Sequence, residues 1–296
     1  MRIIDPHVHI WDLTTGLYPH FEKPSVGLVG DNTPIARSYL LPELLAEADG
    51  NSDIDLAGIV HVEAFPTDRV AETRYLQGLA DASAAGFPQA LVVNADLAAD
   101  DAQAQLEAQC AFANTRGIRQ VLNQHADPLY SYGVPDHLKN PIWQRNFPLL
   151  KRFGLSFDMQ LYPHQIAEAL TIIDANPDVS VILNHACMPC DRSSSGLADW
   201  AAGMRQLGQR PNVAVKISGL GMLDHHWTID SIRPYVLETL EAFTHDRVMF
   251  ASNFPVDKLF STYGELWRAF LSLTSDLSDD ENAALFAGNA ARLYRI

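Results

Sequence analysis

Short runs of apolar, mostly β-branched residues recur along the chain and alternate with longer stretches rich in Ala, Leu, Glu and Gln. The runs predict strands at Arg2–His9, Leu56–Glu63, Gln89–Asp96, Gly117–His125, Leu155–Tyr162, Val179–His185, Asn212–Ser218 and Arg247–Asn253. The stretches between them predict helices at Asp68–Ala85, Ala99–Ala113, Pro141–Arg152, Gln165–Ala175, Leu197–Gly208, Ile229–Thr244 and Tyr263–Leu273. Eight strands that alternate with helices predict an α/β fold, a single (β/α)8 TIM barrel over residues 1–296.

An open, doubly wound sheet is the competing fold, but no glycine-rich phosphate loop follows the first predicted strand. Two connections are longer than usual, from Trp11 to about Pro42 and from Ala126 to about Asn140. In a barrel both lie at the C-terminal face, where active sites are built. We therefore expect these two loops to cover a substrate.

Composition narrows the range of partners. The net charge of −15 argues against a nucleic-acid backbone or an anionic membrane surface as a partner. A small substrate, anionic or polyhydroxylated, fits better, since local arginines can override the overall field. The three cysteines imply no disulfide framework, and the N-terminal residues do not resemble a signal peptide, so we expect a cytoplasmic protein. Barrels of this kind often form homo-oligomers, and the sequence leaves that state open.

Polar residues gather at the C-terminal ends of the predicted strands. Alternation along a strand places His7 and His9 on one side, with Asp5 one layer below. The same reasoning pairs His61 with Glu63, Arg119 with Asn123 and His125, Asp158 with Gln160, and Lys216 with Ser218, and it puts His185 and Asn253 at two further strand ends. Barrel interiors are normally apolar, so a whole ring of polar groups predicts an active site, although any one of them can be a hydrogen-bonded structural residue.

Several of these residues lie in segments that resemble a known family. Asp5-Pro6-His7-Val8-His9 resembles the opening of the amidohydrolase superfamily. Asn184-His185-Ala186, Ser252-Asn253-Phe254-Pro255-Val256-Asp257 and Asn289-Ala290-Ala291-Arg292-Leu293-Tyr294 resemble its amidohydrolase-related, lactonase-like branch, which includes sugar-lactone, muconolactone and pyrone-dicarboxylate lactonases. The likeness spans the chain. It implies a hydrolase that opens a small cyclic ester, a sugar-acid lactone or a related carboxylated lactone, with water.

The resemblance also bears on cofactors. Binuclear members use a carboxylated lysine on strand four or five, where this chain has no lysine. Mononuclear members pair the strand-one histidines with a strand-six ligand, matched here by His185, and a strand-eight aspartate, replaced here by Asn253. An amide is no general base and a poor zinc ligand. We therefore expect no required cofactor, or else a single divalent metal such as zinc held by His7, His9 and His185.

Roles can be assigned on this basis. The catalytic residues we expect are His7, His9, Glu63, His185, Asn253 and Asp257. The histidines would polarise the carbonyl, and Glu63 or Asp257 would take the proton from water. The substrate-binding residues we expect are His61, Arg119, His125, Gln160, Lys216 and His226, with Arg119 on a substrate carboxylate.

Two other functions stay open at this point. One is metal-dependent decarboxylation of a small unsaturated or aromatic acid, against which Asn253 counts. The other is a non-catalytic binding protein on a degenerate barrel, for which Asn253 is the only argument. Cys187 and Cys190 form a Cys-x-x-Cys pair without a second pair, so redox chemistry is not expected. The acidic segment Asp276–Glu281 predicts the N-terminal cap of a last helix.

Overall fold

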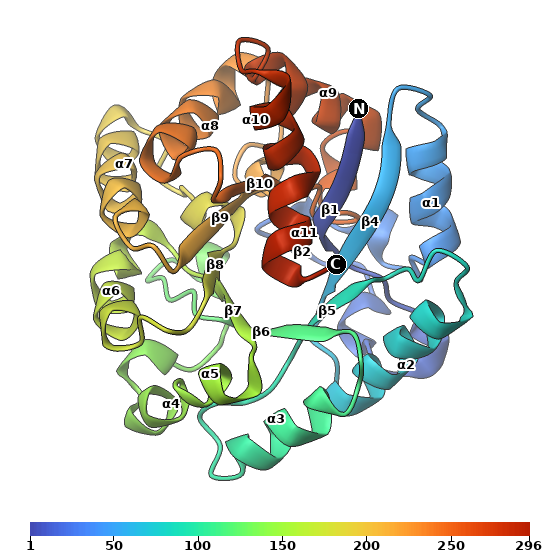
Figure 1. Ribbon diagram of the computed structural model, residues 1–296, viewed down its shortest axis with the longest axis vertical. Helices are drawn as coiled ribbons and strands as arrows, with labels where there is room; N and C mark the ends of the chain where they lie inside the picture. The colour runs from blue at the N-terminus through green and yellow to red at the C-terminus, as the bar shows by residue number, and fades with distance from the viewer.

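The computed structural model describes residues 1–296, and one parallel sheet of eight strands curls into a barrel at its centre (Figure 1). In order around the sheet, the strands are β1 (Arg2–Val8), β4 (Asp55–Val62), β5 (Ala90–Val93), β6 (Thr115–Val121), β7 (Ser156–Gln160), β8 (Val181–Leu183), β9 (Val213–Ile217) and β10 (Val248–Phe250). The ring closes just after β10, where the N–H of His9 donates to the Phe254 carbonyl (2.8 Å) and that of Asn253 to the His7 carbonyl (2.9 Å). The predicted TIM barrel is confirmed.

Helices surround the barrel (Figure 1). They are α1 (Leu41–Asp49), α2 (Arg69–Ala82), α3 (Ala102–Cys110), α4 (Pro141–Asn146), α5 (Leu149–Phe153), α6 (Ile166–Ala175), α7 (Ser194–Gly208), α8 (Ile229–Phe243), α9 (Tyr263–Leu273), α10 (Asp279–Ala283) and α11 (Asn289–Tyr294). The large apolar core lies between these helices and the strands. A smaller core fills the barrel, and Ala290 and Tyr294 of α11 belong to it, so α11 closes the end at which the strands begin. None of the helices combines the length and apolar character needed to cross a bilayer.

Several predicted boundaries were wrong. The predicted strand Gly117–His125 ends at Val121 in β6, so Asn123 and His125 lie in the following loop and share no strand face with Arg119. His185 and Asn253 also follow their strands, and both have a positive φ, 55° and 59°. The side chains of the four residues that lie beyond their strands, Asn123, His125, His185 and Asn253, bond to turns and loops.

Two helix predictions also need correction. The stretch Pro141–Arg152 forms two helices, α4 and α5, because Pro148 has no backbone N–H to continue the ladder. Helix α1 directly follows the first long loop, in a stretch between Pro42 and Leu56 where no helix was predicted. The predicted cap is confirmed, since the Ser278 and Glu281 side chains form a capping box at the start of α10.

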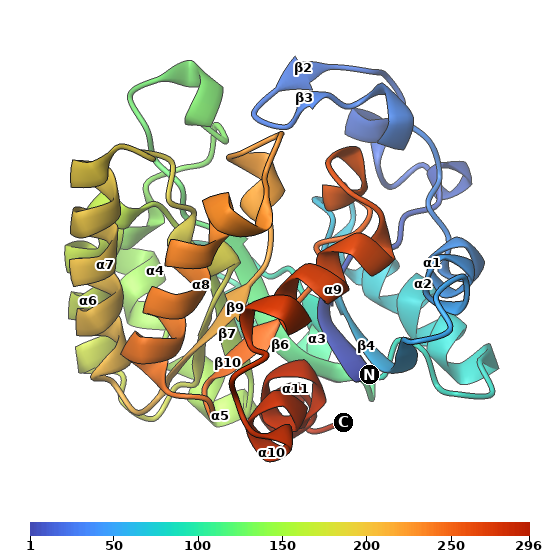
Figure 2. The same cartoon turned by 90° about the horizontal axis from the view of Figure 1, so that it is seen from above.

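The two long loops lie over the barrel end opposite α11 (Figure 2). The first contains a short hairpin of β2 (Val26–Gly27) and β3 (Gly30–Asp31). The second follows β6. The C-terminal ends of all eight strands therefore open beneath these loops, as predicted.

Candidate active site

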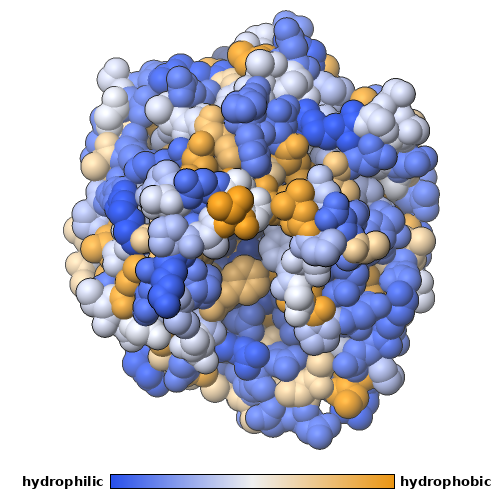
Figure 3. Space-filling view, turned by 180° about the vertical axis from the view of Figure 1, so that it is seen from behind, coloured by the Kyte–Doolittle hydropathy of each residue, from blue (hydrophilic) through white to orange (hydrophobic).

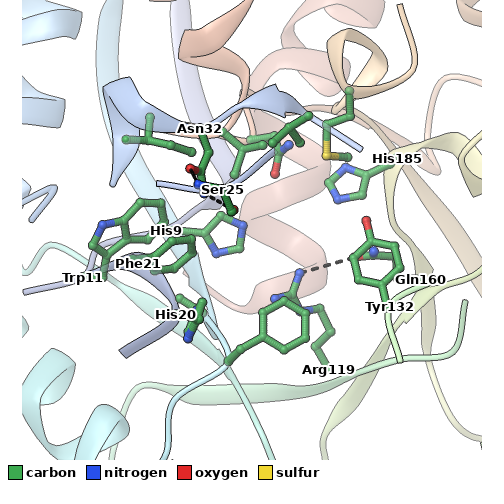
Figure 4. A pocket seen from close by; sticks show the side chains of 17 residues that line it. His9, Trp11, His20, Phe21, Ser25, Asn32, Arg119, Tyr132, Gln160 and His185 are labelled. Carbon is green, nitrogen blue, oxygen red and sulfur yellow. Dashed lines mark hydrogen bonds between the residues drawn. The ribbon is translucent and has the colours of Figure 1, made fainter. Parts of the chain in front are cut away.

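A pocket of about 310 Å³ opens beneath the two loops, and the space-filling view shows it as a hollow in the middle of this face (Figure 3). Five of the residues predicted for the site line it: His9, Arg119, Gln160, His185 and Asn253. They come from the ends of five different strands, and His9, Arg119, Gln160 and His185 surround the cavity in the close view (Figure 4). The structure therefore brings together residues that are far apart in the sequence.

His9 has a defined tautomer. Its Nδ1 lies 2.7 Å from the carbonyl oxygen of Val62, at the end of β4. A carbonyl can only accept, so Nδ1 carries the hydrogen and Nε2 keeps a lone pair. Burial, reinforced by the nearby charge of Arg119, holds the pKa of His9 well below its usual range. His9 is therefore a neutral imidazole at the pocket wall that can accept a proton at Nε2.

His7 and His185 complete a histidine cluster with His9. The His7 ring centroid is 5.0 Å from that of His9 and 4.6 Å from that of His185. His185 is fixed through Nδ1, which lies 2.9 Å from the hydroxyl of Ser218. His7 is fully buried and neither of its ring nitrogens has a partner. His7 does not line the pocket. An unpaired buried polar group costs about 1–3 kcal/mol, so the two ring nitrogens of His7 do not stabilise the fold.

Glu63 and Arg119 form a buried ion pair across the barrel mouth. Arg119 Nε donates to Glu63 Oε1 at 2.6 Å, and Nη2 donates to the Glu63 carbonyl. The other Glu63 oxygen accepts the N–H of Phe65 at 2.8 Å, and Arg119 Nη1 donates to Gln160 at 3.3 Å. Glu63 is thus committed to Arg119 rather than placed to take a proton from water. The charge of Arg119 is likewise already compensated.

Lys216 is engaged in a second buried ion pair. Its Nζ lies 2.6 Å from Asp158 Oδ2, which also accepts a hydrogen bond from the Tyr294 hydroxyl at 2.9 Å. Both charged side chains are inaccessible to solvent, and Lys216 does not line the pocket. The geometry therefore gives Lys216 a structural partner in place of the expected substrate contact.

Asn253 stands at the pocket wall with Asp257 behind it. The Asn253 amide donates to Asp257 Oδ2 at 2.5 Å, and the N–H of Gly221 donates to Oδ1 at 3.2 Å. Burial raises the pKa of Asp257 to about 7. The carboxylate expected on strand eight is therefore present, but one layer back, with an amide between it and the pocket.

Comparison with known proteins places the chain in a family. The amidohydrolase family profile matches residues 4–296. The chain belongs to the amidohydrolase family. It is 46% identical to an uncharacterised protein, y4mH, of Sinorhizobium fredii, with 100% of this chain and 99% of that protein covered. It is 30% identical to an L-fucono-1,5-lactonase of Burkholderia ambifaria, with 99% and 95% covered.

Solved structures agree with this assignment. An amidohydrolase of Burkholderia multivorans, solved with bound HEPES and also with bound zinc, superposes with a TM-score of 0.83 at 26% identity over 100% of both chains. A 2-pyrone-4,6-dicarboxylic acid hydrolase of Pseudomonas putida, described as putative, superposes with a TM-score of 0.74 at 17% identity over 99% and 97% of the two chains. The second likeness shows the shared barrel. This amidohydrolase is accordingly a hydrolase, and the alternative of a non-catalytic binding protein is set aside.

Three other predicted site residues lie outside the pocket of this amidohydrolase. His61 is buried, and its Nδ1 accepts the N–H of Ile10. His125 accepts the N–H of Asp127 and packs against Tyr130 of the second loop and against Tyr162, which follows β7. His226 is exposed on the loop after β9. None of the three is placed to touch a ligand in the pocket.

Other lining residues were not predicted individually. Trp11, Phe21 and Phe65 form an aromatic wall, in which the Trp11 and Phe21 rings stack with centroids 4.0 Å apart. Tyr132 of the second loop lies across the pocket from Trp11 and Phe21 (Figure 4). The aromatic content of both loops was a signal for this wall, but a loop has no periodicity that shows which side chains turn inward.

The histidine cluster can be tested for its fit to a metal ion. His7, His9 and His185 are neutral imidazoles, because burial lowers the pKa of each, and this form binds zinc. No carboxylate completes the set, because Asp257 bonds to the Asn253 amide. Nowhere do three or more His, Cys, Asp or Glu side chains converge in an arrangement able to hold a metal. The residues do not fit a metal centre, although the related Burkholderia multivorans protein binds zinc.

Proposed function

We propose that this amidohydrolase opens an uncharged sugar lactone by adding water to its ester carbonyl. The observation that carries the proposal is His9, whose Nδ1–H is committed to the Val62 carbonyl and whose Nε2 is left as a neutral base. The 30% identical relative named L-fucono-1,5-lactonase supports the same class of substrate. Because Nε2 has no hydrogen to donate, His9 acts as the base rather than as a group that polarises the carbonyl.

The charges near the pocket favour a substrate without a carboxylate. Arg119 is paired with Glu63, and Lys216 with Asp158, so neither cation is free to compensate an anionic ligand. The lining instead combines hydrogen-bonding groups such as Asn32 and Gln160 with the aromatic wall. This mixture suits a polyhydroxylated ring with one apolar face better than the carboxylated lactone that the sequence left open. The volume is at the small end of ligand pockets, about 300–1,000 Å³.

In the proposed reaction, the water oxygen bonds to the carbonyl carbon while its proton passes to His9 Nε2. The carbonyl oxygen becomes an oxyanion, which accepts hydrogen bonds from the Tyr132 hydroxyl and from the Arg119 N–H groups that Glu63 and Gln160 leave unused. Arg119 acts here as a hydrogen-bond donor and not as a free charge. Burial raises the pKa of Tyr132 to about 12, so its hydroxyl stays protonated. The bond from the carbonyl carbon to the ring oxygen then breaks, and the ring oxygen takes the proton from His9. The product is an open-chain hydroxy acid.

His185 contributes from another side of the pocket (Figure 4). Its Nδ1 is engaged with Ser218, which leaves Nε2 to hydrogen-bond the lactone and hold its carbonyl in line with the water. Asn253, anchored by Asp257, presents the rest of its amide to a substrate hydroxyl.

Proton release from L-fucono-1,5-lactone, measured with a pH indicator, tests the proposal. We expect turnover of this neutral lactone, little turnover of pyrone-dicarboxylate, and no change after chelation and removal of metals. Turnover of only carboxylated lactones would contradict the argument from paired charges. Carbon dioxide release from an aromatic acid would favour the decarboxylase, and loss of activity on chelation would show that a metal is required.

A further inference from the structure

The chain that follows β8 adopts an unusual backbone conformation. His185, Ala186, Cys187 and Met188 all have positive φ, at 55°, 47°, 58° and 45°. None is glycine, and in this left-handed region the Cβ of an L-residue crowds the backbone, so each residue is disfavoured there. A run of this kind persists only where the surroundings hold it. His185 begins the run and lines the pocket, so the run sets the direction of its imidazole.

Two side chains from other segments bond to this left-handed turn. The Asn123 amide, in the loop after β6, donates to the Met188 sulfur at 3.4 Å, and the other donor comes from the helix layer. The indole N–H of Trp200, in α7, donates to the Ala186 carbonyl at 2.7 Å. The backbone bonds within the turn, from the Cys187 and Met188 N–H groups, close it but do not tie it to the helix layer. Trp200 is itself immobilised, since it is fully buried and packs edge-on against Tyr235 of α8 at 5.1 Å. The bond therefore links a rigid helix pair to the turn.

The space around the His185 ring leaves little freedom once the turn is fixed. A Cβ on Gly219 would lie 2.6 Å from His185 Nδ1, so the absence of a side chain at Gly219 is what admits the ring. On the same side, the Ser218 hydroxyl lies 2.9 Å from Nδ1. Both contacts are possible only if the turn holds the His185 ring in one position.

We propose that Trp200 is a positioning residue, which fixes the left-handed turn through the Ala186 carbonyl and so aims the His185 imidazole into the pocket. Trp200 does not line the pocket and touches no substrate. The inference rests on the proposed function for its kinetic readout, but the orientation of His185 can be measured without a substrate.

The chain offers a matched control for Trp200. Trp267 in α9 is also fully buried, but its indole N–H has no partner. Trp200→Phe and Trp267→Phe therefore remove the same atoms, and only the first removes a hydrogen bond. We expect kcat of Trp200→Phe to fall by about 10- to 100-fold with KM little changed, because misaligned groups cost transition-state rather than ground-state binding. Trp267→Phe should keep kcat close to that of the unaltered enzyme.

Imidazole ¹⁵N–¹H spectra, with the His185 signals assigned from His185→Gln, give the second readout. In Trp200→Phe the His185 signals should shift or broaden, and in Trp267→Phe they should not. If the unaltered enzyme opens no lactone but this spectral difference is seen, the proposed function fails and the role of Trp200 stands. Unchanged His185 signals, or equal losses of kcat in the two variants, overturn the role.

Should Trp200→Phe fail to fold, incorporation of 3-benzothienyl-alanine at position 200 keeps the shape of the ring and replaces the N–H by sulfur. The same replacement at position 267 is its control. A loss of kcat and a changed His185 spectrum confined to position 200 support the proposal. No difference between the two positions overturns it.

Discussion

The pocket has two walls of different origin. The strand-end wall consists of His9, Arg119, Gln160, His185 and Asn253, each no more than 5% exposed and each hydrogen-bonded to another part of the barrel. The loop wall consists of Trp11, His20, Phe21, Ser25, Val29, Asn32 and Ile35 from the first loop and Tyr132 from the second. At the tip of the first loop, Val26 is 84% exposed. Under the proposed function, the strand-end wall supplies the base, and the loop wall, apart from the Tyr132 hydroxyl, controls which ligand enters.

The strongest test of the strand-end wall is His9→Gln. Glutamine keeps a polar group of similar size but cannot accept a proton, so kcat/KM for the lactone should fall by about 10²–10⁴. Stopped-flow or indicator assays at neutral pH measure the change. His125→Gln is the control, because His125 bonds within its own loop outside the pocket. Near-full turnover by His9→Gln would show that another residue is the base. It would also contradict the assignment of the base to the strand-end wall.

The ion pair of the strand-end wall makes a prediction about stability. Arg119→Met leaves the Glu63 carboxylate buried without its partner, and we expect a loss of about 3–5 kcal/mol in the free energy of unfolding. Adding Glu63→Gln to the same chain removes the uncompensated charge and should regain most of that loss, but not the activity. Urea unfolding of the single and double variants measures both changes. A double variant as unstable as Arg119→Met would show that the unpaired charge of Glu63 is not the main cause of the lost stability.

Much of the strand-end wall could be predicted from the sequence, because its residues follow apolar runs whose order around a barrel is fixed. The prediction that His9 and His185 lie at the barrel mouth was reached in this way, and both line the pocket. The hydrogen-bond partners of the charged residues could not be predicted. The partner of Arg119 is 56 residues away in the sequence and that of Lys216 is 58 residues away. A sequence shows that a cationic side chain is near the site, but it does not show that another side chain already compensates this charge. For this reason the sequence left an anionic substrate open.

The loop wall was predictable only in outline. Length and aromatic content indicated that both loops cover the pocket, but nothing in the sequence distinguishes Phe21, which faces inward, from Val26, which faces solvent. Phe65 was missed for a related reason. It follows β4 with a φ of 55°, and such a turn does not continue the alternation of the strand. Ion pairs between residues far apart in the sequence, and left-handed turns, form only in the folded chain. Local sequence patterns therefore do not reveal them.

Asp257, behind the strand-end wall, makes stability depend on pH. Its pKa rises from 3.8 to about 7 on burial, so between these values the folded chain holds a proton that the unfolded chain has lost. This contribution to stability is complete below about pH 4 and is lost as the pH rises through about 7. Asp257→Asn is neutral at every pH. The free energy of unfolding of Asp257→Asn, relative to that of the unaltered protein, should therefore increase from pH 5 to pH 8. The expected increase is on the order of a few kcal/mol.

Urea unfolding at the two pH values measures this gain. Asp31→Asn is the control, because Asp31 is exposed and hydrogen bonds from Thr33 lower its pKa, so it is ionised at both values. An equal pH response in the two variants would show that Asp257 is not protonated in the folded protein.

The smallest expected effect concerns what holds the loop wall in place. His225 Nε2 lies 2.9 Å from the Leu28 carbonyl of the hairpin loop, and the His225 ring stacks on Phe260 with centroids 4.9 Å apart. His225→Ala removes this one link across the pocket mouth. A single hydrogen bond contributes about 0.5–1.5 kcal/mol, so KM should rise by about 2- to 10-fold while kcat stays unchanged. His226→Ala is the matched control at the exposed neighbouring residue, and it also tests the expectation that His226 binds substrate. If KM rises in His226→Ala and not in His225→Ala, this loop contacts the ligand directly, and the loop wall does more than control access.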